Sequence, residues 1–184
     1  MSTSHVLPVL HTPDRWAAYD AARRLLALAV SPSGIEVRAY APQLTPAQAR
    51  PLRAAFPENV GIRGDLSHPE PGEEAAVEPA PFVFNVEDRP AGAVEEQFLD
   101  VVGTVTASLS WDGFAWPAAP ELGLEPRYKD TALQLVLNNR SLDYDAPAGD
   151  HTLFIHFRAG DVERAEWLAR QVGLTAIGPV ELGW

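Results

Sequence analysis

Strand-like segments separated by single helices are the strongest constraint on how this 184-residue chain can fold. An apolar strand over residues 6–10 precedes Thr12-Pro13-Asp14, which combines a capping hydroxyl, an N-terminal proline and an early acid. The alternating strand 35–40 is likewise followed by a helix start at residues 45–48, where Thr45 and Gln48 can form a capping box. This order predicts β-α-β units.

The second half of the chain repeats the pattern. A strand is expected over 82–87, then a helix opened by Asp88 and Pro90, while residues 104–116 can be read as helix or strand. Strands at 131–139 and 151–158 form a hairpin, Asp161 caps a last helix, and a closing strand covers 175–182.

These elements predict an α+β fold made of ferredoxin-like β-α-β units, with a mixed or antiparallel sheet and helices packed on one face. Residues 1–66 would be an N-terminal β-α-β-α-β half, 67–81 an acidic, proline-rich linker or loop, and 82–184 a ferredoxin-like half. Residues 35–116 and 82–182 each read as a complete β-α-β-β-α-β unit, yet they share 82–116. One sheet or two, and one continuous domain or two, therefore remain open.

Composition restricts the chemistry. There is no cysteine, which excludes disulfides, thiolate metal sites and a cysteine nucleophile. A net charge of −11 with a single lysine argues against nucleic-acid binding. The apolar run 25–30 is far shorter than the roughly 20 residues of a membrane span. We expect a soluble, cytoplasmic protein with no membrane partner.

The usual catalytic and nucleotide-binding motifs are missing. The sequence contains no Walker loop, no G-x-G-x-x-G and no G-x-S-x-G elbow. His151 and His156 are five residues apart on one predicted strand, a spacing that directs them to opposite faces. Neither a metal site nor a cofactor is expected.

A polar sheet face is the place where a ligand site is expected. Leucines, isoleucine and phenylalanines point to one face of the strands 82–87, 131–139 and 151–158, which helices would cover. If these strands share a sheet, its other face carries the candidate ligand-binding residues His156, Arg158, Glu87, Asn85, Gln134 and Asn138. Arg158 could hold an anion, and Glu87 beside His156 could act as an acid/base pair. The alternative is a solvated face or an interface.

These observations predict a non-catalytic regulatory or interaction protein that binds an unknown protein or small ligand and forms a homodimer through an edge strand. The alternative is a hydrolase or phosphoesterase-like enzyme that uses His156 and Arg158 with an acid such as Glu87 or Asp150.

One turn suggests a family. The element order, followed by Trp111-Asp112-Gly113-Phe114, is similar over roughly residues 14–116 to the small acidic ribonuclease E inhibitor family. Only the Asp-Gly-aromatic turn is shared residue by residue, and the C-terminal third is not covered. The resemblance implies a ferredoxin-like fold and regulation by protein contact.

Overall fold

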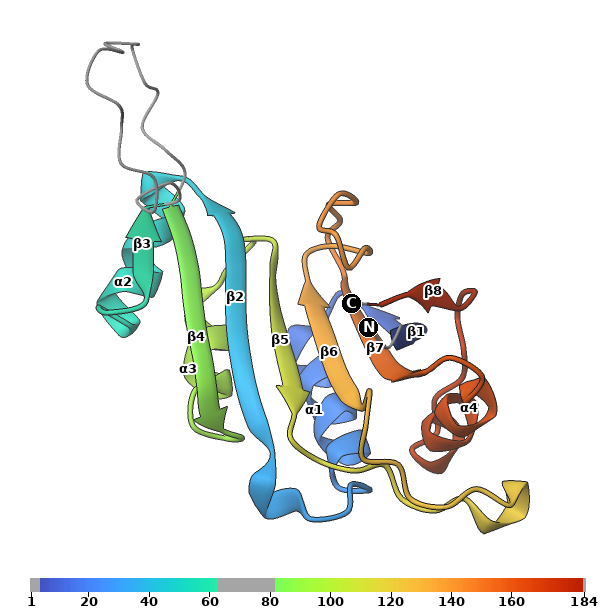
Figure 1. The fold of residues 1–184 in the computed structure, drawn as a ribbon. Coiled ribbons are helices and arrows are strands. Elements are labelled where there is room, and N and C mark those ends of the chain that lie inside the picture. The colour runs from blue at the N-terminus through green and yellow to red at the C-terminus, as the bar shows by residue number, and fades with distance from the viewer. Residues whose placement is uncertain (1–3, 63–81, 184) are drawn as a thin grey trace, which may run out of the picture.

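The computed structural model describes residues 4–62 and 82–183, so the predicted linker 67–81 lies outside the described residues. Within them, the α+β class is confirmed: four α-helices accompany eight strands of one sheet (Figure 1). The elements are, in order, β1 (Ser4–Thr12), α1 (Arg15–Leu26), β2 (Glu36–Leu44), α2 (Pro46–Ala55), β3 (Val60–Ile62), β4 (Phe82–Pro90), α3 (Glu95–Val101), β5 (Ala107–Asp112), β6 (Ala132–Leu137), β7 (His151–Arg158), α4 (Val162–Gln171) and β8 (Glu181–Leu182).

The strands follow the order β3-β4-β2-β5-β6-β7-β1-β8, and every ladder is antiparallel. Each helix therefore joins two strands that run in the same direction, with at least one opposite strand between them. For example, α2 joins β2 to β3 across β4, and α3 joins β4 to β5 across β2. The sheet includes strands from both predicted halves of the chain, because β1 pairs with β7.

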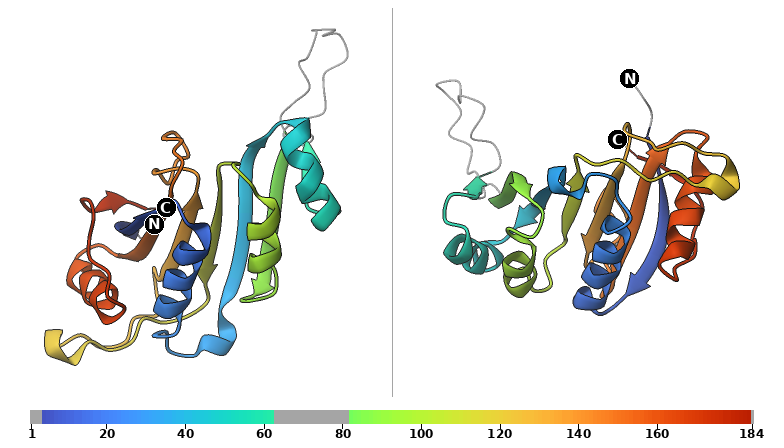
Figure 2. Two further views of the ribbon diagram at one scale, coloured as in Figure 1. Left: turned by 180° about the vertical axis from the view of Figure 1, so that it is seen from behind. Right: turned by 90° about the horizontal axis from the view of Figure 1, so that it is seen from below.

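One face of the sheet packs against the helices, as the views from behind and below show (Figure 2). The buried residues of all four helices join a single apolar core with the inward side chains of the strands. Phe84 packs in that core, stacked on Phe98 with ring centroids 5.2 Å apart. No helix in the described part of the chain combines the length and apolarity needed to cross a bilayer.

The opposite face, which we call the open face, is only partly covered. The segment between β6 and β7 places Leu142 over it, and a small second cluster forms with Val6, Val136 and Phe154. The neighbouring part, on β2 and β4, carries exposed polar side chains such as Arg38, whose guanidinium lies within ion-pair distance of Asp88 and Asp112. The open face thus has a covered half and a polar half.

The helix starts are mostly as expected. The capping box at Thr45 and Gln48 is confirmed, with both reciprocal hydrogen bonds present. At α1 the cap is Asp14 rather than Thr12: the Asp14 carboxylate accepts hydrogen bonds from the backbone N–H groups of residues 16 and 17. Asp161 occupies the N-cap position of α4, but its side chain makes no cap bond and pairs with Arg164 instead.

The prediction that Asp88 and Pro90 open a helix is wrong. The β2–β4 ladder continues to Pro90, with an irregularity where Asp88 takes a positive φ of 51°, and α3 begins only at Glu95. Pairing with β2 outweighs the local helix signal, and a proline at a strand terminus is tolerated. Residues 107–112 are strand β5, whereas the predicted closing strand shrinks to Glu181–Leu182.

The turn after β5 requires glycine at position 113. Gly113 has a φ of 75°, and a Cβ atom there would lie 2.5 Å from the Gly34 carbonyl oxygen. We expect Gly113→Ala to lower the free energy of unfolding by about 3 kcal/mol, because backbone strain and a backbone clash add. Gly123→Ala is the matched control, since its φ is 67° but its Cβ would meet nothing within 4 Å. Equal urea midpoints for the two variants would contradict the role of the close contact.

Candidate functional site

Two of the predicted site residues meet in the covered half of the open face. His156 Nε2 lies 3.0 Å from Gln134 Oε1, across the β6–β7 ladder. Both side chains are almost completely buried. Burial lowers the pKa of His156 to about 4, so the imidazole is neutral at pH 7. The pair is a buried hydrogen-bonded contact rather than a solvent-facing acid/base group.

The structure does not bring the charged candidates together. Glu87 and Asn85 lie on β4, where Asn85 Nδ2 donates a hydrogen bond of 2.9 Å to Glu87 Oε1. Three strands separate β4 from β7, which corresponds to about 19 Å at the usual strand spacing. Arg158 is exposed at the end of β7, opposite Ser4. An acid/base pair of Glu87 and His156 is therefore excluded by this geometry.

The hydrogen bonds of Asn138 join two segments of the chain. Asn138 takes a left-handed conformation directly after β6, with a φ of 55°. Its Nδ2 donates to the carbonyl oxygens of Gly103 and Val105, and its backbone N–H donates to His151 Nδ1. Thr106 Oγ1 in turn donates to the Asn138 carbonyl. These bonds fix the segment before β5 against the end of β6.

The open face contains a hollow that we call the tyrosine pocket. The segment before β5 forms one of its walls. The pocket encloses about 540 Å³ and lies between the end of β2, the start of α2, the segment before β5 and the segment between β6 and β7. Its lining residues are Tyr40, Pro42, Gln43, Gln48, Thr104, Thr106, Asp143, Tyr144 and Pro147. Hydroxyl and amide groups dominate, and the two tyrosine rings lie 6.2 Å apart, tilted by 55°.

Tyr144 is held in the pocket by a partly buried hydrogen bond. Its hydroxyl lies 2.8 Å from Ser108 Oγ on β5, and its backbone φ is 61°. A left-handed conformation costs a residue with a bulky side chain about 1 to 2 kcal/mol. Burial raises the pKa of the Tyr144 hydroxyl, while the hydrogen bond with Ser108 acts in the opposite direction. The surrounding contacts thus hold the backbone at Tyr144 in a conformation that the isolated segment would not favour.

The buried pair of His156 and Gln134 lies behind Tyr144. The nearby Gln134 amide lowers the pKa of the Tyr144 hydroxyl, in opposition to burial. Among the described residues, Gln134 Nε2 nevertheless has no acceptor in hydrogen-bonding geometry. Gln134 therefore links His156 to the back of the tyrosine pocket, and two predicted residues contribute to its support rather than to its lining.

Sequence reasoning missed the lining residues. Tyr40 could have been found, because it shares the outward face of its strand with Glu36 and Arg38 and interrupts a polar pattern. In the ladder it lies opposite Asn85, which places that predicted residue beside the pocket. Tyr144 gives no such signal, since it belongs to an irregular segment whose position depends on the distant Ser108.

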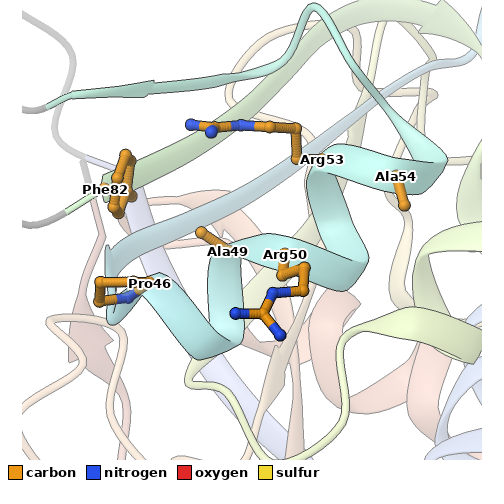
Figure 3. Close-up of a pocket in the computed structure, with 6 residues that line it drawn as sticks. All are labelled: Pro46, Ala49, Arg50, Arg53, Ala54 and Phe82. Carbon is orange, nitrogen blue, oxygen red and sulfur yellow. The ribbon is translucent and has the colours of Figure 1, made fainter.

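A second hollow of about 370 Å³ lies on α2 (Figure 3). The Arg53 guanidinium lies over the Phe82 ring, 5.1 Å from its centroid, whereas Arg50 extends away from Arg53 (Figure 3). The two cations of this hollow do not converge on one point. It therefore lacks the paired guanidinium groups that would hold an anion in two directions.

A third hollow, of about 320 Å³, contains a buried carboxylate. Glu95 accepts hydrogen bonds from the backbone N–H groups of Gly92 and Val94 and from Trp111 Nε1. Burial, and secondarily the charge of Glu95, raise the pKa of the neighbouring Tyr19 to about 12. These bonds occupy the carboxylate and anchor the start of α3, which is a structural use.

In the part of the chain that the structure describes, no group of three His, Asp or Glu side chains is arranged to hold a metal ion. No family model, curated protein or solved structure matches the chain. The chemistry of the site must therefore be argued from its own residues. The tyrosine pocket offers aromatic faces, hydroxyls, amides and one carboxylate, which is a set suited to binding.

Proposed function

We propose that this chain is a non-catalytic interaction protein that recognises its ligand through the tyrosine pocket. The observation that carries the proposal is Tyr144, which lines the hollow with its hydroxyl hydrogen-bonded to Ser108 and its backbone in a strained left-handed conformation. Strained residues fixed by their surroundings cluster at ligand sites. A pocket of this size with a few placed polar groups is typical of small-ligand binding.

The hydrolase or phosphoesterase alternative has less support. It relies on His156 and Arg158 acting with Glu87 or Asp150. His156 is buried against Gln134, and the Asp150 carboxylate is engaged by Arg140 in a two-pronged hydrogen bond. A catalytic base needs to reach its proton directly or through one water. The contacts of these residues favour a binding role for the protein.

Further features belong to the same proposal. Residues 36–112 have the element order β-α-β-β-α-β and the strand order β3-β4-β2-β5, which supports the ferredoxin-like description of this part. The edge strand β8, which contains the exposed Leu182, and the exposed Ile177 and Val180 before it support a homodimer, which sedimentation at increasing concentration would detect. We propose a cytoplasmic location and no nucleic-acid partner, consistent with the charge of −11.

Chemical-shift mapping by NMR tests the binding proposal. The probes are metal ions, nucleotides, phosphorylated metabolites, sugars, organic cations and short peptides. At least one class should shift the signals of Tyr40, Thr106 and Tyr144 together, and Tyr40→Val should weaken that binding roughly fivefold to tenfold through loss of one aromatic contact.

Tyr128→Val is the matched control, because Tyr128 is 69% exposed and does not line the pocket. It should leave the affinity unchanged. The proposal is wrong if every probe class leaves the pocket signals in place, or if a bound probe is converted to product.

A further inference from the structure

The electrostatics of the tyrosine pocket select the charge of its ligand. Among the described residues that line it there is no lysine or arginine, while Asp143 contributes a carboxylate at the rim. The whole chain carries a net charge of −11. An anionic ligand would find no positive side chain in the pocket and would be repelled by the negative charge of the protein. A cation would be attracted by that charge at a distance and by the Asp143 carboxylate inside the pocket.

The aromatic lining selects the kind of cation. Tyr40 and Tyr144 come from β2 and from the segment between β6 and β7, and their ring planes meet at 55° with centroids 6.2 Å apart. A group in the angle between the rings lies within about 6 Å of both centroids, the range over which a ring attracts a cation. The two rings and the Asp143 carboxylate line the same hollow, a combination that favours an alkylated ammonium group, whose methyl groups can pack on aromatic rings.

The other residues that line the pocket also suit an alkylated ammonium ligand. Pro42 and Pro147 add apolar surface, and the Gln43 and Thr104 side chains offer polar groups farther round the hollow. The Tyr144 ring is already fixed by the Ser108 hydrogen bond, so that little rotational freedom is left to lose on binding. The site is therefore preorganised for a compact ligand with an apolar, positively charged head and a polar tail.

We propose that the tyrosine pocket binds a methylated or alkylated ammonium group. This inference rests on the proposed binding function and adds the chemical class of the ligand. Two sources share that chemistry: a free small molecule of the choline type and the trimethylated side chain of a lysine. Their tails differ, so separate probes distinguish them.

Titration calorimetry with choline and with 3,3-dimethylbutan-1-ol, its uncharged analogue of the same shape, tests the inference. Choline should bind the full chain at least about tenfold more tightly, and its affinity should fall as salt is added. A short peptide with one trimethyl-lysine forms the second arm. If the peptide alone binds, the source is a protein; if choline binds as well, a small molecule suffices.

The matched variants are Asp143→Asn and Asp145→Asn. Both remove one charge from the same exposed segment, but only Asp143 lines the pocket. Asp143→Asn should weaken choline binding several-fold and leave the uncharged analogue unaffected, and Asp145→Asn should change little. Equal binding of choline and its analogue would overturn the ammonium inference while leaving the pocket a binding site. Pocket signals that respond to no probe class would overturn the proposed function itself.

Discussion

Replacing Arg164 with methionine is expected to lower the free energy of unfolding by about 3 to 5 kcal/mol, the usual result of removing one partner from a buried ion pair. Arg164 is 1% exposed in α4, and its Nε donates to Asp161 Oδ2 at 3.0 Å. Its two terminal nitrogens donate to the carbonyl oxygens of Pro117 and Glu125. Methionine fills similar space but leaves the carboxylate and both carbonyls without these donors.

Arg170→Met is the matched control on the same helix. The Arg170 side chain is 55% exposed and lies 3.9 Å from Glu166, an exposed pair worth at most about 1 kcal/mol. Urea midpoints measure both effects, and the Arg164 variant should also melt roughly 10 °C lower. Similar midpoints for the two variants would contradict a stabilising role for the buried network. Arg164→Lys should recover only part of the loss, because an ammonium cannot reproduce the three-directional fork.

Stability should fall as the pH is lowered from about 6.5 toward 4, because of His156. Burial lowers its pKa from 6.5 to about 4, so below pH 6.5 the unfolded chain takes up a proton that the folded chain does not. At pH 4.5, two pH units below the pKa of the unfolded chain, this difference lowers the free energy of unfolding by roughly 3 kcal/mol. His151, whose pKa burial also lowers, acts in the same direction. Well above pH 6.5 both histidines are neutral in the folded and in the unfolded chain, and the effect on stability vanishes.

The measurement compares unfolding free energies at pH 7 and pH 4.5 for the wild type and His156→Gln. Glutamine keeps a hydrogen-bonding group beside Gln134 but cannot titrate, so the difference in unfolding free energy between pH 7 and pH 4.5 should shrink by roughly 3 kcal/mol. Staying above pH 4 avoids carboxylates such as Asp150, whose lowered pKa affects stability only in more acidic solution. An unchanged difference in the variant would show that His156 does not cause the loss.

The local elements were largely predictable because their signals are local. The capping box at Thr45 and the alternation of Leu133, Leu135 and Leu137 depend on neighbouring residues, and both give the expected helix and strand. The segment after residue 87 was misjudged for the opposite reason. Asp88 and Pro90 resemble a helix start, but the ladder with β2 continues to Pro90 past an irregularity at Asp88, and no nearby residue indicates that pairing.

The candidate site could be predicted only in part. Period-two alternation correctly separates the face of Gln134 and His156 from that of the leucines, and the structure joins these two side chains. The alternation cannot show that β2, β5 and β6 lie between the strand of Glu87 and that of His156, because strand order is a property of the whole sheet. The alternation also cannot predict that Tyr144 lines the pocket, because the position of Tyr144 depends on a hydrogen bond to a residue 36 positions away.

The pairing of β1 with β7 has a consequence for the order in which the chain can assemble. Ser4 lies opposite Arg158 in that ladder, so β1 cannot pair with β7 until about 150 further residues have been synthesised. Strands β2, β4 and β5 follow one another much more closely and can pair earlier. We therefore expect β2, β4 and β5 to pair during synthesis before β1 takes its place beside β7.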